Sequence, residues 1–265
     1  MKLKFLGTGA ADWDWNNFPP GTRGPCSTLV GGSCLIDLGW NALHNFTAAG
    51  ISPEVVSDIV ITHAHGDHFS PDEILKLAAA AGHPVRLWAS ANALADVDSP
   101  LVDKHVVAPR SVFTVGSLEF TAMPANHFSR IGDTPFHYLV REGDVRLLYA
   151  TDGVWIDAEE KYILEEALRS SGTLLDAVIW DSTLGPAKSD YRFASHNSLN
   201  VVRQLKHLFA RNGYTRRGAR HFLDHLSREL WPKDPDGRAR LAARLGATLV
   251  EDGMEAEVRC AKRCR

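Results

Sequence analysis

One short segment constrains this chain more than any other part of its sequence. It reads THAHGDH from Thr62 to His68 and follows an apolar stretch, residues 58–62, that is typical of a buried strand. Three imidazoles and a carboxylate this close together cannot be buried without partners, because a desolvated polar group needs compensation. A loop at the end of a strand would direct them toward one crevice, and both groups are ligands of zinc, manganese and iron. The segment therefore predicts a metal site rather than a solvent-facing polar loop.

Strand and helix signals alternate along the rest of the chain. Strands are expected at 2–6, 27–30, 34–37, 58–62, 85–89, 111–122, 136–141, 145–150, 177–180, 220–223 and 247–250. Helices are expected at 40–49, 71–81, 158–169, 199–210 and 238–245, the second with Ser70 as its N-cap before Pro71. Strand-rich blocks punctuated by helices, in two successive halves, predict two packed sheets with helices outside. Because no linker-like stretch separates the halves, residues 1–265 are expected to form a single domain.

Composition excludes several classes of protein. The chain is 45% hydrophobic and 23% charged, close to the average for soluble proteins. Its apolar runs are far shorter than the ~20 residues of a membrane span, so we expect no membrane association. The net charge of −3 gives no broad basic field, and nucleic acid is not an expected partner. The run of Arg216, Arg217 and Arg220 is expected in a solvated loop. The first residues lack the apolar region of a signal peptide, which favours a cytoplasmic location.

The HAHGDH segment resembles the signature of the metallo-β-lactamase fold superfamily. The remaining ligand positions of that family can be matched in order along the chain. They are a histidine at a strand end (His127), an aspartate after a hydrophobic strand (Asp152) and a histidine after the last core strand (His225). The resemblance spans nearly the whole chain, from the GTG turn at residues 7–9 to His225. It implies an α/β fold, the four-layer αββα sandwich.

The resemblance also implies a ligand set for two divalent metal ions. One ion would be bound by His63, His65 and His127, the second by Asp67, His68 and His225, and Asp152 would bridge them. A carboxylate can hold two cations about 3.5–4 Å apart, and such a pair lowers the pKa of a shared water. Zinc or manganese is expected, and iron also suits these ligands. Asp37 is either a hydrogen-bond partner of a ligand histidine or an ordinary turn residue at a strand end.

A sixth histidine narrows the expected chemistry. His196, followed by Asn197, lies just before the helix expected at 199–210, where free N–H groups and the helix dipole favour an anion. This pattern resembles the phosphodiesterases of the superfamily, specifically the PhnP type of the carbon–phosphorus lyase pathway. There the histidine is a general acid or a phosphate contact. The candidate catalytic residues are therefore His196 and the metal ligand Asp67.

The chain departs from the PhnP type in its cysteines. That type carries an extra zinc site built from closely spaced cysteines after the first strand, where this chain has DWDWNN at 12–17. We therefore expect the extra site to be absent. No CxxC pair exists, and we expect reduced thiols rather than a zinc knot at all four cysteines: Cys26, Cys34, Cys260 and Cys264.

Two other sets of residues complete the expectations. The loop at 10–25 contains Trp13, Trp15 and Phe18, which either line the mouth of the site or pack on the sheet edge. The remaining histidines have no partners nearby in the sequence, and we expect them to be structural or solvent-exposed: His44, His83, His105, His137, His207 and His221.

The function expected from these residues is hydrolysis of a phosphodiester. Hydroxide formed at two metals would attack phosphorus in a small nucleotide or ribose phosphodiester, cyclic ones included, and His196 would protonate the leaving alkoxide. The alternatives on the same scaffold are a lactonase, a thioesterase, a β-lactamase or a ribonuclease Z-like nuclease. A metal-binding or oligomerising protein without activity is a further alternative. The expected partner is a small phosphodiester substrate, and a homodimer is left open.

Overall fold

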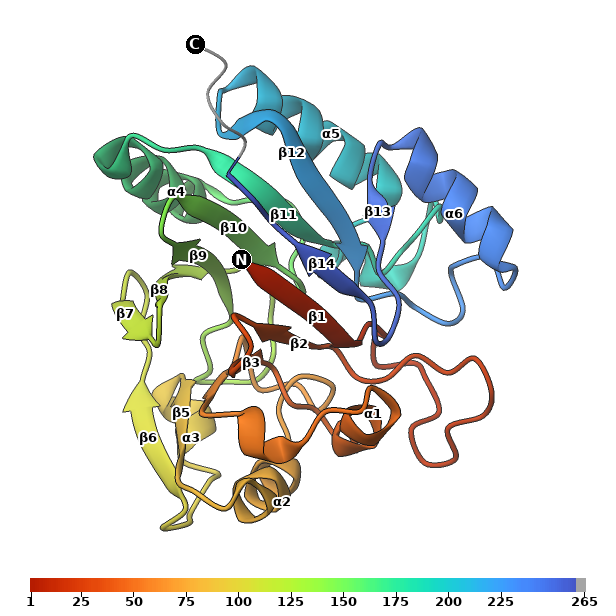
Figure 1. Cartoon of the computed structure of the whole chain (residues 1–265). Helices are drawn as coiled ribbons and strands as arrows, with labels where there is room; N and C mark the ends of the chain where they lie inside the picture. Colours follow the sequence, from red (N-terminus) through yellow and green to blue (C-terminus); the bar gives the residue numbers. More distant parts are fainter. Residues whose placement is uncertain (261–265) are drawn as a thin grey trace.

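The computed structural model describes residues 1–260, whose strands form two mixed sheets packed face to face (Figure 1). The first sheet contains β1 (Lys2–Gly7), β2 (Ser27–Val30), β3 (Cys34–Ile36), β4 (Asp58–Val60), β5 (Val85–Ala89), β6 (Val102–Val106) and β14 (Glu255–Glu257). The second contains β7 (Val112–Val115), β8 (Leu118–Pro124), β9 (Phe136–Glu142), β10 (Val145–Ala150), β11 (Leu175–Asp181), β12 (Thr215–Asp224) and β13 (Thr248–Leu249). Their orders across the sheets are β14-β1-β2-β3-β4-β5-β6 and β13-β12-β11-β10-β9-β8-β7.

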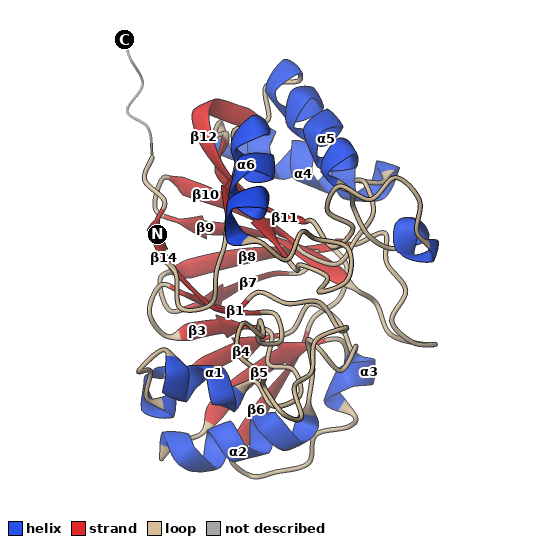
Figure 2. Cartoon of the chain, turned by 90° about the vertical axis from the view of Figure 1, so that its right-hand side faces the viewer, coloured by secondary structure: helices blue, strands red, loops and turns tan. Residues whose placement is uncertain are grey.

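Helices cover the outer face of each sheet (Figure 2). Over the first sheet lie α1 (Leu43–Ala48), α2 (Pro71–Ala81) and α3 (Ala91–Leu94), and over the second lie α4 (Ala158–Ser171), α5 (Leu199–Arg211) and α6 (Pro235–Arg244). Two short 3-10 helices, η1 (Pro53–Val55) and η2 (Tyr191–Ala194), lie between strands and helices. The resulting succession of helix, sheet, sheet and helix confirms the four-layer αββα sandwich predicted from the sequence.

The main core fills the space between the two sheets. Phe5 of β1 packs there against Phe222 of β12, with ring centroids 5.5 Å apart, and Phe120 meets Tyr138 edge to face at 5.7 Å. Complete burial of a large apolar side chain contributes about 1.5–3 kcal/mol, so the many apolar side chains of this core stabilise the packing of the two sheets. Two further apolar clusters lie outside this core, and each of them joins one sheet to the helices that cover it.

Several strands differ from the sequence expectation. The single strand expected at 111–122 is a hairpin, β7 and β8, because Gly116 adopts a left-handed backbone (φ 59°) that turns the chain. The edge strands β6 and β14 were not expected. The expected strand 220–223 is only the last part of β12, which pairs with β11 from Thr215 onward.

That longer strand also corrects the expectation of a solvated arginine loop. Arg216 lies in β12 and forms an ion pair with Asp176 (Nε–Oδ1, 2.8 Å). Arg220 lies over the ring of Phe222 at 4.7 Å. Helix boundaries shift as well: α1 begins at Leu43 rather than residue 40, and α6 begins at Pro235, where Asp234 caps its N-terminus.

The topology brings the carboxyl ends of several strands to one edge of the sandwich. Strands β3 to β6 run parallel, and so do β10 to β13, so loops that follow these strands emerge together. Short bridges from Gly9 to Leu226 and from Leu38 to Phe69 tie the loops at this edge. A crevice outside the carboxyl ends of strands is where α/β proteins commonly bind ligands. None of the helices between residues 1 and 260 has the length and apolar character that crossing a membrane requires.

Candidate metal centre

All seven predicted ligands lie at this edge. The loop after β4 carries four of them, and one follows each of β8, β10 and β12. Their ligand atoms fall into two groups, in each of which all atoms lie within 4.8 Å of one another: His63, His65, His127 and Asp152; Asp67, His68, Asp152 and His225. Asp152 belongs to both groups, the position that the sequence assigns to a bridging carboxylate. Residues up to 162 positions apart in the chain thus converge, because strands from both sheets have their carboxyl ends at this edge.

Three polar residues at the site adopt a backbone conformation that is unusual for side chains other than glycine. Asp37, Asp152 and His225 have φ values of 63°, 54° and 58°. Such a conformation costs on the order of 1–3 kcal/mol per residue and persists only where the surroundings impose it. Strain of this kind is concentrated at functional sites, which supports a functional role for this edge.

In the first group the imidazoles of His63, His65 and His127 converge on one point. His65 Nδ1 lies 2.9 Å from His63 Nε2 and 3.1 Å from His127 Nε2, and His63 Nε2 lies 3.2 Å from Asp152 Oδ2. Burial lowers the pKa of His127 to about 3 and also lowers the pKa of His65. Both rings are therefore neutral near pH 7, which is the form that binds a cation.

The second group is buried and more acidic. His68 Nε2 lies 3.1 Å from both Asp152 Oδ2 and His225 Nε2, and Asp67 Oδ2 lies 3.2 Å from His225 Nε2. Burial lowers the pKa of both imidazoles, but the neighbouring carboxylates outweigh it, Asp152 most strongly. The pKa of His225 rises to about 10 and that of His68 lies well above its ordinary value. Without a metal, protons occupy this group.

The donors fit a divalent cation. His68 Nδ1 lies 2.7 Å from Asp37 Oδ2, so the hydrogen on Nδ1 leaves the Nε2 lone pair of a neutral ring facing Asp152 and His225. Lone pairs that face one another at this distance repel unless a proton or a metal cation lies between them. Asp152 Oδ1 is also buried without a hydrogen bond, although His225 Nδ1 is 2.8 Å away. A cation held by these atoms would satisfy both observations, and imidazole with carboxylate suits zinc, manganese or iron.

The structure decides two alternatives that the sequence left open. Asp37 contacts a candidate ligand histidine, and it also accepts hydrogen bonds from the backbone and hydroxyl of Thr62. The aromatic side chains of the 10–25 loop pack instead of lining the mouth of the site. Trp13 Nε1 donates to the Leu226 carbonyl (2.7 Å), Trp15 is buried, and Phe18 stacks on His44.

His196 lies beside the two ligand groups. It follows η2 and precedes Ser198, the N-cap of α5, and its ring stacks on that of His225 with centroids 5.5 Å apart. Its Nδ1 lies 2.8 Å from Asp181 Oδ2, which leaves Nε2 for the cavity that His196 lines. Burial lowers the pKa of His196, but Asp181 and then Asp152 outweigh it and raise the pKa above its ordinary value. A raised pKa favours the protonated imidazole that can act as an acid.

Asp181 is a candidate functional residue that the sequence reasoning missed. It ends β11, is completely buried and also accepts hydrogen bonds from the backbone N–H groups of Thr183 and Asn197. Its signal was present, because an aspartate follows the apolar strand expected at 177–180. An aspartate at a strand end is equally typical of a turn, so only the contact with His196 identifies its role.

A cavity of about 360 Å³ opens over this cluster, lined by His65, Asp67, Thr183, His196 and His225 among others. Its rim is built from three loops joined through Asp12. The Asp12 carboxylate accepts hydrogen bonds from Ser227 Oγ (2.5 Å) and from the Arg228 N–H (2.8 Å), and it lies 3.5 Å from Arg192 Nη1. The cavity has room for a small molecule, and its rim is held in place by charge-assisted contacts.

The cysteines and the other histidines lie elsewhere. Cys26 and Cys34 are buried thiols, and the groups that could hold a metal within residues 1–260 contain no cysteine. Cys264 lies outside the described residues. Outside these groups, His137 pairs with Glu160, His105 stacks on Trp88 and His221 accepts a hydrogen bond from Trp180, whereas His83 bonds to backbone carbonyls and His44 and His207 are exposed.

Comparison with known proteins supports the family inferred from the sequence. Residues 34–210, about two thirds of the chain, match the family described as the Beta-lactamase superfamily domain. No match was found among curated proteins.

Solved structures share the fold over nearly the full chain. YhfI from Bacillus subtilis, a metallo-β-lactamase fold protein, has a TM-score of 0.71 at 15% identity, covering 96% of this chain and 98% of its own. Zn²⁺-bound PqqB from Methylobacterium extorquens has a TM-score of 0.69 at 16% identity, covering 97% and 100%. Human tRNase Z, short form, has a TM-score of 0.66 at 20% identity, covering 98% and 100%. At these identities the likeness concerns the fold alone.

Proposed function

The chain belongs to the Beta-lactamase superfamily, and on this premise we propose that it is a dinuclear metal-dependent phosphodiesterase. Its proposed substrate is a small nucleotide or ribose phosphodiester, cyclic or linear. The observation that carries the proposal is His196, which Asp181 holds at 2.8 Å beside both ligand groups. The sequence resemblance of this histidine to the PhnP type supports the same substrate class.

In the proposed enzyme each of the two ligand groups would hold one divalent cation. His63, His65 and His127 would hold one cation, Asp67, His68 and His225 a second, and Asp152 both. Two divalent cations, when bound, supply an activated water and neutralise the oxygens of a phosphoryl group. Asp67 is buried, and His68 and His225 outweigh the effect of burial to hold the pKa of Asp67 below its usual range. It therefore stays ionised at neutral pH and available as a ligand.

His196 would supply the proton that the reaction needs. Departure of an alkoxide from phosphorus is slow unless the leaving oxygen receives a proton as its bond to phosphorus breaks. His196 can give the proton from Nε2, while the Asp181 carboxylate accepts the hydrogen on Nδ1 and stabilises the protonated ring. Thr183 Oγ1, 3.2 Å from the same Nδ1, fixes the ring orientation further.

A substrate panel tests the proposal against other hydrolytic activities. The purified protein is loaded with Mn²⁺ or Zn²⁺ and assayed with bis(p-nitrophenyl) phosphate, cyclic nucleotides, a lactone, a thioester and a β-lactam. We expect turnover of the phosphodiesters alone. Turnover of the lactone, thioester or β-lactam without phosphodiester hydrolysis would overturn the proposal, and cleavage of transfer RNA precursors in place of small diesters would favour the ribonuclease Z-like alternative.

The variant His196→Ala tests the role of the acid. We expect phosphodiester turnover to fall by about 10²–10⁴-fold, the usual contribution of general acid catalysis, with metal content unchanged. His207→Ala, an exposed histidine of α5, is the matched control and should retain full turnover. Unchanged turnover in His196→Ala would remove the main support for a phosphodiester substrate.

The cytoplasmic location and the single domain over residues 1–265 stay predictions from the sequence, and a homodimer stays open. Gel filtration with light scattering measures the oligomeric state directly.

A further inference from the structure

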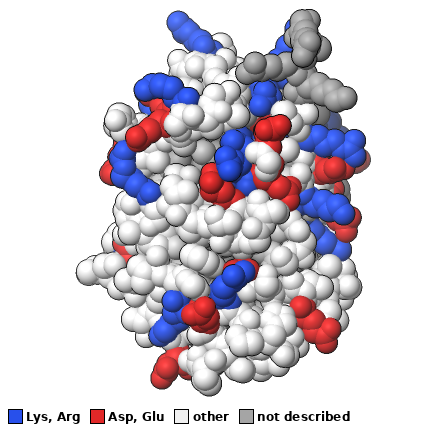
Figure 3. Space-filling model, turned by 60° about the vertical axis from the view of Figure 1, so that its left-hand side comes forward, with Lys and Arg blue, Asp and Glu red and all other residues white. Residues whose placement is uncertain are grey.

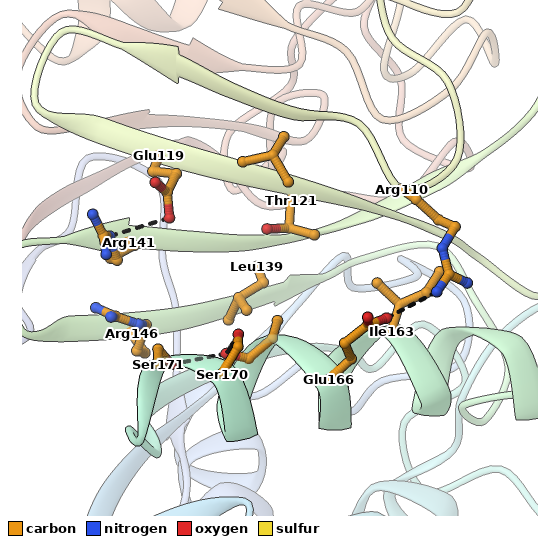
Figure 4. A pocket seen from close by; sticks show the side chains of 12 residues that line it. Arg110, Glu119, Thr121, Leu139, Arg141, Arg146, Ile163, Glu166, Ser170 and Ser171 are labelled. Carbon is orange, nitrogen blue, oxygen red and sulfur yellow. Dashed lines mark hydrogen bonds and ion pairs between the residues drawn. The ribbon is translucent and has the colours of Figure 1, made fainter.

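A second cavity, of about 480 Å³, lies away from the histidine cluster, between α4 and the outer face of the second sheet (Figure 4). We call it the α4 groove. Leu139 of β9 and Ile163 of α4 form its apolar middle, with Thr121 of β8 beside them. The other lining residues include three arginines and two glutamates: Arg110, Arg141, Arg146, Glu119 and Glu166.

Two of the arginines are paired and the third is not. Arg141 Nε lies 3.1 Å from Glu119 Oε1, and Arg110 Nη2 lies 2.9 Å from Glu166 Oε2, as the dashed lines in Figure 4 show. Arg146 is only 4% exposed and forms no ion pair with any residue of the described chain. Its Nη1 instead donates to the carbonyls of Gly143 (2.8 Å) and Val145 (3.2 Å).

The position of Arg146 makes its positive charge unfavourable for the stability of the fold. In the antiparallel pairing of β9 with β10, Arg146 lies directly opposite Arg141, and like charges in that relation destabilise a sheet. A buried charge without an ion-pair partner adds a desolvation cost. Burial and then the charge of Arg141 lower the pKa of Arg146, and Glu119, Asp144 and Asp176 offset this only in part, although Arg146 stays protonated. Among the residues that line the groove, the arginines exceed the glutamates by one positive charge.

We propose that the α4 groove binds a small organic monocarboxylate, with the carboxylate at Arg146 and Arg141 and the apolar body on Leu139 and Ile163. Arginine presents paired N–H donors that match a carboxylate. The single excess charge suits a monoanion better than a phosphate dianion, and the apolar middle of the groove suits a ligand with a hydrocarbon body. On the face in Figure 3 both signs of charge are interspersed, so no extended basic field would attract a polyanion there.

The α4 groove shares no lining residue with the cavity over the metal centre, so this inference does not rest on the proposed reaction. Hexanoate is the probe, and it is titrated into the metal-loaded protein by isothermal titration calorimetry. We expect saturable binding of one hexanoate per chain. Hexylammonium, with the opposite charge, and inorganic phosphate, without a hydrocarbon body, should not bind in the groove.

Two variants and two controls locate the binding. Arg146→Met removes the unpaired charge, and we expect it to weaken hexanoate binding at least about tenfold, the effect of losing a charged hydrogen bond. Ala167→Leu fills the groove from α4 without touching a charge and should weaken binding similarly. Arg169→Gln, exposed on the same helix, and His65→Ala, in the metal centre, should leave binding unchanged.

Three results would overturn the inference. They are no saturable binding of hexanoate to the wild-type chain, equal binding by wild type and both groove variants, and loss of binding in His65→Ala. Circular dichroism of Arg146→Met shows whether that variant folds, and Ala167→Leu decides the matter if it does not. Phosphate binding that depends on Arg146 while hexanoate fails to bind would also contradict a monocarboxylate ligand.

Discussion

The two halves of the histidine cluster share Asp152, and yet the pKa values of their histidines shift in opposite directions. In the first half, His63, His65 and His127 contribute imidazoles only, and burial lowers the pKa of His65 and His127. In the second half, Asp67, His68 and His225 lie among carboxylates that raise the pKa of both histidines. The larger number of carboxylates around the histidines of the second half therefore distinguishes the halves.

This contrast in pKa arises from the carboxylates and the burial around each half. In the second half Asp37 contacts the buried His68 and Asp152 contacts the buried His225, so negative charge accumulates in a medium that screens it poorly. In the first half His65 and His127 are only partly buried, and the cavity is lined by His65 from this half and by Asp67 and His225 from the other. A cation in the second half would be held mainly by charge, and one in the first half mainly by neutral nitrogen donors.

The largest expected effect comes from the residue that the halves share. In Asp152→Asn the carboxylate near His63, His68 and His225 is neutralised, and we expect both cations to be lost. Turnover should fall by ~10³-fold or more, since each cation supplies several kcal/mol of charge stabilisation. Metal content by plasma mass spectrometry and steady-state kinetics measure the two effects. Two cations retained in Asp152→Asn would show that the halves do not depend on a common bridge.

The second largest effect is expected in the pH dependence of metal affinity, which should differ between the two halves. His225, with a pKa of about 10, and His68 are protonated at pH 7 in the metal-free protein, and a cation must displace those protons. Affinity of the second half should therefore rise about tenfold or more per pH unit between pH 6 and 8. The first half, whose His65 and His127 are already neutral, should show a smaller change over this range.

Single-site variants make that comparison measurable. His65→Ala leaves only the second half intact, and Asp67→Ala leaves only the first. Calorimetry in buffers of different ionisation enthalpy counts the protons released by each variant as Zn²⁺ binds. Equal proton release from the two variants would contradict the contrast between the halves.

A smaller and one-sided effect is expected from Asp37→Asn. Asp37 contacts His68 directly at 2.7 Å, whereas it is linked to His63 of the first half only through Thr62 Oγ1, which lies 3.0 Å from His63 Nδ1. Loss of a direct partner reduces metal affinity by about 10–100-fold, and we expect this loss mainly in the second half. A competition assay with a chromogenic chelator measures it. An equal loss from both halves would show that Asp37 acts on the whole fold rather than through His68.

The smallest expected effect should reach both halves equally. His137 Nδ1 lies 2.6 Å from Glu160 Oε1, and the ring lies so close to Gly153, next to Asp152, that a Cβ there would be 2.6 Å from His137 Nε2. Glu160→Gln weakens this buried pair and should lower the stability by about 1–3 kcal/mol in urea unfolding. Turnover should fall only a few-fold, with metal lost from neither half preferentially.

The sequence predicted the ligands better than it predicted their surroundings. His63 to His68, His127, Asp152 and His225 each follow a strand that reads clearly as apolar, and parallel strands deliver their ends to one edge. The structure brings all of them together, although their roles as ligands stay a prediction. By contrast, the role of Asp181 and the contact of Asp37 with His68 are visible only in the distances between side chains. No local sequence pattern contains those distances.

The missed elements have physical causes of the same kind. Strand β6 reads VDKHV, and β14 reads EAE, so neither has the apolar character of a strand by itself. They form because β5 and β1 offer unpaired backbone groups at the sheet edges. The division of 111–122 into two strands depends on one glycine in a left-handed conformation, which a run of strand-forming residues conceals.

The distance along the chain between the first and last ligands has a consequence for biosynthesis. His63 leaves the ribosome long before His225, and at ordinary elongation rates on the order of ten seconds separates them. A nascent chain that does not yet contain His225 cannot complete the second half of the cluster. A cation that the second half holds would therefore bind only after translation of the last ligand.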